Sequence, residues 1–244
     1  MKKKILFLLF TLIAVSGCSK ANGHTTLNAL DKPLAWQEKR EKPFGKYDYG
    51  MLDEQKFNKL LKEKFEVSLP KYYKDMTITF TKNFVTEEVY AEQPDYFITA
   101  QGETLYLKIV SQYKETQELV LYTTMEFEYV FDRENGQVTL KNQSVMINDA
   151  SKEGKLLNNT FDQLITDMGQ VTNIKHINKK LEEFHTLTKK EKDNLSNQII
   201  VLYDDSAVGK ERNELQKVLS VQYNPEGILK NTYFYIVDVI DEEK

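Results

Sequence analysis

The sequence is poor in the residues that most directly reveal chemistry. Its 244 residues include one cysteine, one tryptophan and three histidines. A single cysteine excludes an intramolecular disulfide, so packing must stabilise the fold. The histidines, His24, His176 and His185, lack the spacing of a metal site, and we expect neither a metal nor any other cofactor.

Catalytic signatures are also missing. The chain contains no GxSxG or SxxK motif, which would mark a serine nucleophile, and no HExxH motif, which would mark a zinc hydrolase. The sequence therefore assigns no catalytic residue. It leaves enzymatic activity open and gives no positive argument for it.

An excess of positive charge is the third absence. The precursor has 33 basic and 37 acidic residues and a net charge of −4. Nucleic acid is therefore not an expected partner, because binding to phosphate groups needs a basic surface. A basic protein partner would fit this charge, although mild acidity also serves solubility alone.

The N-terminus has the three parts of a secretory leader. Lys2, Lys3 and Lys4 form a basic start, eleven apolar residues follow at positions 5–15, and small residues precede Cys18. Eleven residues are too few for a membrane-spanning helix, which needs roughly 20. Two other interpretations of this segment remain open: a membrane helix that is not cleaved, and an ordinary secretory leader in which Cys18 occurs by chance.

The segment Val15-Ser16-Gly17-Cys18 resembles the lipobox of bacterial lipoproteins, in which an aliphatic residue and two small residues precede a cysteine. The resemblance implies a diacylglycerol thioether on Cys18 and cleavage of the Gly17–Cys18 bond by the lipoprotein signal peptidase. It also implies attachment, through that lipid, to the outer face of the cell membrane, since two acyl chains anchor a protein stably.

Three regions follow from this interpretation. Residues 1–17 are the signal peptide, residues 18–50 are the lipid anchor with a flexible tether, and residues 51–244 form a single extracytoplasmic domain. The tether is predicted because residues 19–50 are mostly polar and contain several glycines and prolines without an apolar period.

The folded part is expected to belong to the α+β class. The pattern predicts a leading helix over residues 54–65, a meander of antiparallel strands between residues 77 and 147, three helices packed on one face, and a C-terminal hairpin. The strand run begins at TITFTKNF, where Ile78, Phe80 and Phe84 alternate with polar residues. Residues 132–136 read as a hairpin turn because Asn-Gly permits positive φ.

The three helices are predicted from caps and apolar stripes. Thr160 caps the first and Gly169 ends it, the second contains Ile174 to Phe184, and Thr188 opens the third with Leu195, Ile199 and Leu202 inward. The final hairpin joins residues 215–223 to 229–240. Its second strand is apolar on both faces, so we expect it to be central and covered by the helices.

The strand over residues 119–131 offers a candidate binding face. Tyr122, Thr124, Glu126 and Glu128 alternate with apolar residues and should point toward solvent. Glu126 and Glu128 lie ~7 Å apart along a strand, which also suits a carboxylate pair of the glycosidase type. A solvated strand face is the simpler interpretation.

The first functional hypothesis is a surface binding module that uses this face to bind an unknown protein. The size, location and element order resemble those of streptococcal surface immunity proteins of the TipC type, which block a secreted toxin. A cell-envelope enzyme is the second hypothesis. The third is a peptide pheromone trimmed from the leader at residues 9–17.

Overall fold

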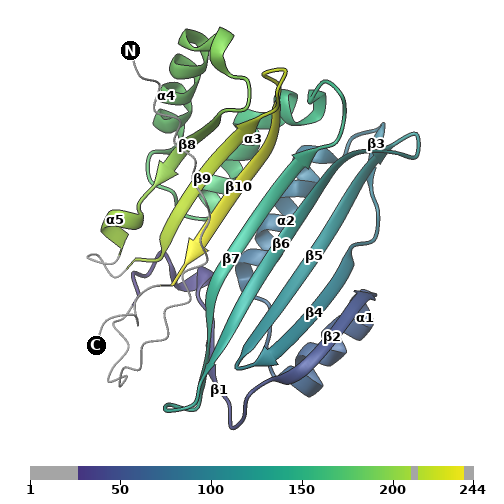
Figure 1. Cartoon of the computed structure of the whole chain (residues 1–244), viewed down its shortest axis with the longest axis vertical. Coiled ribbons are helices and arrows are strands. Elements are labelled where there is room, and N and C mark those ends of the chain that lie inside the picture. The colour runs from purple at the N-terminus through teal and green to yellow at the C-terminus, as the bar shows by residue number, and fades with distance from the viewer. Residues whose placement is uncertain (1–26, 210–213, 239–244) are drawn as a thin grey trace.

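The computed structural model describes residues 27–209 and 214–238, which form a long antiparallel sheet with helices behind it (Figure 1). The predicted signal peptide, Gly17, Cys18 and residues 19–26 lie outside the described residues. None of the described helices is both long and apolar enough to cross a membrane.

The sheet is built from ten strands within the described part of the chain. Their bounds are β1 Gln37–Lys39, β2 Gly45–Leu52, β3 Val89–Ala91, β4 Asp95–Gly102, β5 Thr104–Glu115, β6 Glu118–Asp132, β7 Gln137–Asp149, β8 Ile199–Asp204, β9 Gln216–Tyr223 and β10 Leu229–Val237. The strand order is β2-β4-β5-β6-β7-β10-β9-β8, with β1 added beside β7 and β3 beside β5. Every pair is antiparallel, as the predicted meander and C-terminal hairpin require.

The helices are spread along the sheet and differ in length. Their bounds are α1 Glu54–Leu60, continued by a π-helical turn at Leu61–Phe65, then α2 Lys71–Phe84, α3 Lys155–Val171, α4 Ile177–Lys190 and the short α5 Ser206–Gly209. Two 3-10 turns, Lys32–Leu34 and Lys192–Asn194, complete the elements. Helices α2 and α3 lie behind the sheet, α1 contacts β4, and α4 contacts β8 (Figure 1).

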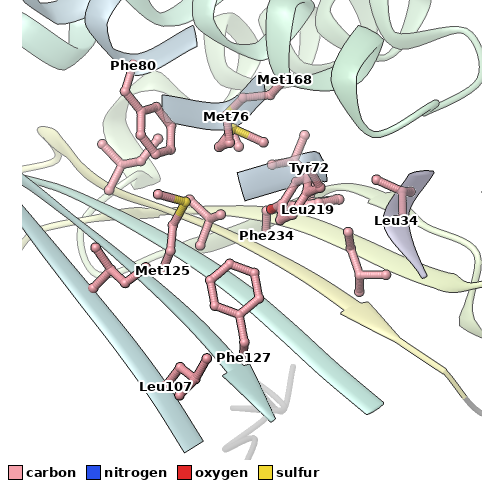
Figure 2. Packing of buried hydrophobic residues seen from close by; sticks show 14 of the residues in the cluster. Leu34, Tyr72, Met76, Phe80, Leu107, Met125, Phe127, Met168, Leu219 and Phe234 are labelled. Atoms are coloured by element: carbon pink, nitrogen blue, oxygen red, sulfur yellow. The ribbon is translucent and has the colours of Figure 1, made fainter. Parts of the chain in front are cut away.

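The core fills the space between the sheet and helices α2 and α3. Figure 2 shows Met76 of α2 and Met168 of α3 above Met125 and Phe127 of β6, with Phe234 of β10 beside them. All five side chains are almost fully buried. The alternation read in β5 and β6 is therefore confirmed, because one face of each strand supplies this core.

The strand predicted at residues 77–84 is wrong, because this segment is the second half of α2. Tyr72, Met76, Phe80 and Phe84 recur every four residues and are all buried, whereas Ile78 is 57% exposed. The short window from residue 77 concealed this helical period. The threonines of α2 are accommodated because their hydroxyls donate to carbonyls one turn earlier.

The predicted starts of the helices after the meander are also corrected. Thr160 lies inside α3, whose first turn is capped by the buried Asp149 through a bond from the Leu157 N–H (2.8 Å). Gly169 does not end α3. A Cβ there would meet Ile177 at 2.7 Å, so this glycine lets the start of α4 approach closely.

The third predicted helix does not exist as such. Thr188 lies within α4, where its hydroxyl donates to the Phe184 carbonyl, and Ile199 and Leu202 belong to strand β8. The β-branched run at residues 199–201 favours a strand over a helix. Two long helices, rather than three, therefore follow the meander.

The tether expected up to residue 50 is wrong from residue 27 onward. Leu34 is fully buried, Phe44 is 3% exposed, and the guanidinium of Arg40 donates to the carbonyls of Lys42 and Phe65. Strand β1 pairs with β7 and β2 pairs with β4. This segment is polar because it lies at the surface of the fold, and a few anchoring residues suffice to hold it.

Candidate functional site

The sheet has one face that helices α2 and α3 leave uncovered, and we call it the open face (Figure 1). On β6 it carries Tyr122, Glu126 and Glu128, as the sequence predicts, since the intervening residues face the core. Thr124 points the same way but is only 5% exposed. The predicted face therefore exists, and its threonine contributes support rather than contact area.

The strand register brings β10 and β7 into the same surface. Tyr122 is level with Asn148 and Asn231, while Glu126 is level with Ser144 and Tyr235. Between these rows, Thr124, Met146 and Tyr233 form a third row. The centre of the open face is thus a group of three tyrosines, Tyr122, Tyr233 and Tyr235, flanked by the carboxylates of β6.

The contribution of β10 was missed in the sequence because its run Tyr-Phe-Tyr-Ile-Val reads as apolar on both faces. The strand is central, as expected, but the helices cover one face only. Phe234 and Ile236 are buried, whereas Tyr233 and Tyr235 are partly exposed on the open face. The alternation of tyrosine with purely apolar residues was the available signal.

The hydroxyls of Tyr233 and Tyr235 are partly shielded from water. Burial, and then the neighbouring hydroxyls of Tyr235 and Tyr122, raise the pKa of Tyr233. Burial, and then the charge of Glu126, raise the pKa of Tyr235. These side chains therefore remain neutral and offer apolar rings with polar tips, which suits contact with another molecule.

A ladder of side-chain amides supports the tyrosines from β7 to β9. The side-chain amide of Asn148 donates to Asn231, and the side-chain amide of Asn231 donates to Oε1 of Gln222 (3.1 Å). The Tyr233 hydroxyl donates to the same oxygen (3.0 Å). The polar groups are thus held in fixed positions, which lowers the entropy lost when a partner binds.

Glu126 and Glu128 engage separate partners across the strands. Glu126 lies 3.8 Å from the Lys108 ammonium and accepts from the Ser144 hydroxyl (3.4 Å). Glu128 accepts a hydrogen bond from the Asn142 amide. Burial, and then the charge of Glu128, raise the pKa of Tyr106. The two carboxylates lie on the open face of the sheet, and each is held by its own neighbours.

Two grooves in the described part of the chain lie away from this centre. One of about 490 Å³ is lined by Glu38, Lys62 and Val67, and another of about 430 Å³ lies between the start of α4 and the end of β8. Neither includes Tyr122, Glu126 or Glu128. The centre of the open face therefore lies outside both of these grooves.

The histidines within the described residues do not join the open face. His176 precedes α4 with a positive φ of 59°. His185 is exposed on α4 and contacts Asp162 of α3 at 2.8 Å. Among the residues that the structure describes, no group of three or more His, Cys, Asp or Glu side chains could hold a metal ion.

Comparison with known proteins identifies no relative: no family model, no curated protein and no solved structure matches this chain.

Proposed function

We propose that this chain is a lipoprotein, anchored through lipid on Cys18 to the outer face of the cell membrane, which binds a protein partner with its open face. The observation that carries the proposal is a ten-stranded sheet with helices on one side only. Helices can cover both faces of a sheet, but here helices α2 and α3 cover one face. The other, open face carries the partly buried tyrosines Tyr233 and Tyr235. Tyrosine is enriched at the core of protein interfaces.

The charge supports a basic or neutral partner. Loss of Lys2, Lys3 and Lys4 with the leader would leave 30 basic and 37 acidic residues, a net charge of −7. On the open face, Glu126 pairs with Lys108 at 3.8 Å, and Glu128 accepts a hydrogen bond from the Asn142 amide. A basic surface on the partner would be attracted to this region and would associate faster.

The short distance between anchor and fold supports a partner at the membrane. Residues 19–26 are the only ones between Cys18 and the described fold. Eight residues span at most about 28 Å when fully extended. The open face would then remain close to the bilayer, where a secreted toxin that attacks the cell envelope must arrive, and immunity against such a toxin is the role that we favour.

The anchor is tested by expressing the full chain and the Cys18→Ser variant in the presence of labelled palmitate. We expect the parent to incorporate label, lose its leader and sediment with membranes, and the variant to do none of these. A parent chain that retains its full precursor mass and takes up no label would remove the lipoprotein part of the proposal.

The binding face is tested in intact cells by photo-crosslinking. A benzophenone amino acid replaces Tyr122 on the open face or Ile78, an exposed residue of α2 on the opposite side. We expect a discrete crosslinked protein from position 122 and none from position 78. Crosslinks from position 78 alone, or the same set from both positions, would contradict an interface on the open face.

A further inference from the structure

The two terminal strands of the sheet differ in how their free edges are protected. Strands β2 and β8 each pair with one neighbour, so each leaves unpaired main-chain groups along its outer edge within the described residues (Figure 1). Such an edge can pair with a strand from another chain, and proteins usually block it with charges, prolines or bulges.

Strand β2 carries this protection. Lys46 and Asp48 are exposed charges on it, and the register shifts between Tyr49 and Leu52. On the other face of β2, the ammonium of Lys64 lies 3.2 Å from the Tyr47 ring centroid. A second chain that approached β2 would have to desolvate or displace these charges.

Strand β8 lacks charged protection over its first half. Residues 198–203 are uncharged, and Ile199 and Val201 are 59% and 54% exposed. Both point to the open face, since they are level with Gln222 and Ser220 of β9. A register shift after Val201 ends the regular edge, so residues 198–201 form the unprotected part.

We infer that this part of β8 is a self-association edge, at which a second copy of the chain adds its own β8 antiparallel to the first. A two-fold axis at Ile200 would place Ile199 of each copy opposite Val201 of the other. The two open faces would then form one continuous surface on the same side. Within the described residues, the strand segment 198–203 at the seam is uncharged, so identical copies meet along it without like-charge repulsion.

We expect the partner at the β8 edge to be a second copy of the chain, because the N-terminal end of the described residues lies close to this edge. Asp31 accepts from the Leu215 N–H (2.9 Å) and from the Lys217 ammonium, which fixes the N-terminal segment beside β9, the strand next to β8. Only eight residues separate this segment from Cys18. Copies anchored in one membrane, as the proposed function has it, would hold their β8 edges at similar heights, and this confinement raises their effective concentration.

The pairing is tested first on the anchored chain. Because Cys18 is the sole cysteine and is consumed by lipid, Val201→Cys introduces one free thiol on β8, and Asp48→Cys introduces one on the protected β2 edge. After treatment of membranes with a short bismaleimide reagent, we expect a crosslinked dimer from Val201→Cys at a yield about tenfold above that from Asp48→Cys. Equal yields, no dimer, or a crosslink to a protein of another size would overturn the inference.

A second measurement separates this inference from the proposed anchor. The leaderless chain with Cys18→Ser is followed by sedimentation equilibrium, with Val201→Lys and the matched surface variant Ile78→Lys. We expect Val201→Lys to raise the dimer dissociation constant more than about tenfold and Ile78→Lys to leave it unchanged. Dimers in solution would support the edge even if palmitate labelling of the full chain fails. If the full chain takes up palmitate but neither assay detects a dimer, the edge is ruled out and the anchor remains.

Discussion

Asp31 and Lys217 form a buried ion pair across 186 residues of sequence, with 2.6 Å between Oδ1 and Nζ. Their side chains are 3% and 5% exposed. The pair fastens the segment that follows the proposed anchor to strand β9, at the far end of the chain. Because the second carboxylate oxygen of Asp31 accepts from the Leu215 N–H, both oxygens have a partner.

Loss of one partner of this pair should be costly. Asp31→Asn removes the closest counter-charge of the buried Lys217 ammonium, and we expect the free energy of unfolding to fall by about 3–5 kcal/mol. Urea denaturation followed by circular dichroism measures this change. Lys179→Met provides the control, because the Lys179–Glu183 pair is exposed and such pairs contribute at most about 1 kcal/mol. Similar losses in the two variants would refute the special role of Asp31.

Acid should weaken the contact between α2 and α3. Burial acts to raise the pKa of Asp167, but hydrogen bonds from Lys82, Asn83 and Gln163 outweigh it and hold this pKa below its ordinary value. The unfolded chain therefore takes up the proton first, so this contribution to stability is present above the unfolded pKa and is lost as the pH falls through the folded pKa. Unfolding curves collected between about pH 5 and pH 2 should show a smaller loss in Asp167→Asn than in the parent. A parallel pair of curves would contradict this assignment.

Alkali should act through two buried tyrosines on the core side of the sheet. Burial raises the pKa of Tyr113 and of Tyr223 to about 12. Since the unfolded state loses these protons near the ordinary pKa of 10, the stabilising effect is complete below pH 10 and disappears as the pH rises through 12. We expect Tyr113→Phe to weaken the pH dependence of unfolding in this range, as measured by thermal denaturation. Tyr90→Phe, at an exposed site, should leave it unchanged.

The sequence predicted the sheet better than the helices. Strands β5 and β6 alternate over many residues, and one face of each is buried, so their period of two is unambiguous. In α2, the eight residues from Thr77 to Phe84 fit both periods, and only Tyr72 and Met76, which lie before this window, reveal the helix. Local patterns decide an element only when the window covers its full length.

The candidate face was half predictable for a related reason. Tyr122, Glu126 and Glu128 follow from the alternation of one strand, but Tyr233 and Tyr235 enter the same surface through the pairing of β10 with β7. No local pattern specifies which strands become neighbours 90 residues apart. The same holds for Leu34, which is buried because its 3-10 turn contacts α2. The polar sequence around Leu34 does not predict this long-range contact.

Charge reversal on the open face should reduce partner binding without unfolding the protein. Glu126→Lys places a second cation beside Lys108, so a basic partner would be repelled. We expect the yield of the crosslink from position 122 to fall about tenfold, with little change in the melting temperature. Glu182→Lys on the exposed side of α4 is the matched control and should retain the parental yield. An unchanged yield in Glu126→Lys would show that the partner does not recognise this charge.

Truncation should show that the folded domain includes residues before 51. The leaderless chain that retains residues 19–50 gives the reference melting temperature. A chain that starts at residue 51 loses β1, most of β2, and the Asp31–Lys217 pair, and we expect it to unfold without cooperativity.

The same boundary can be tested with two leucines of one short segment. Leu34 is fully buried and Leu30 is 53% exposed. Leu34→Ala should lower the free energy of unfolding by about 2–5 kcal/mol because it opens a cavity, while Leu30→Ala should stay within about 0.5 kcal/mol of the parent. If both substitutions were neutral, residues 27–50 would behave as a tether. The distance between the lipid and the fold would then be long, which would contradict the proposal of a partner close to the membrane.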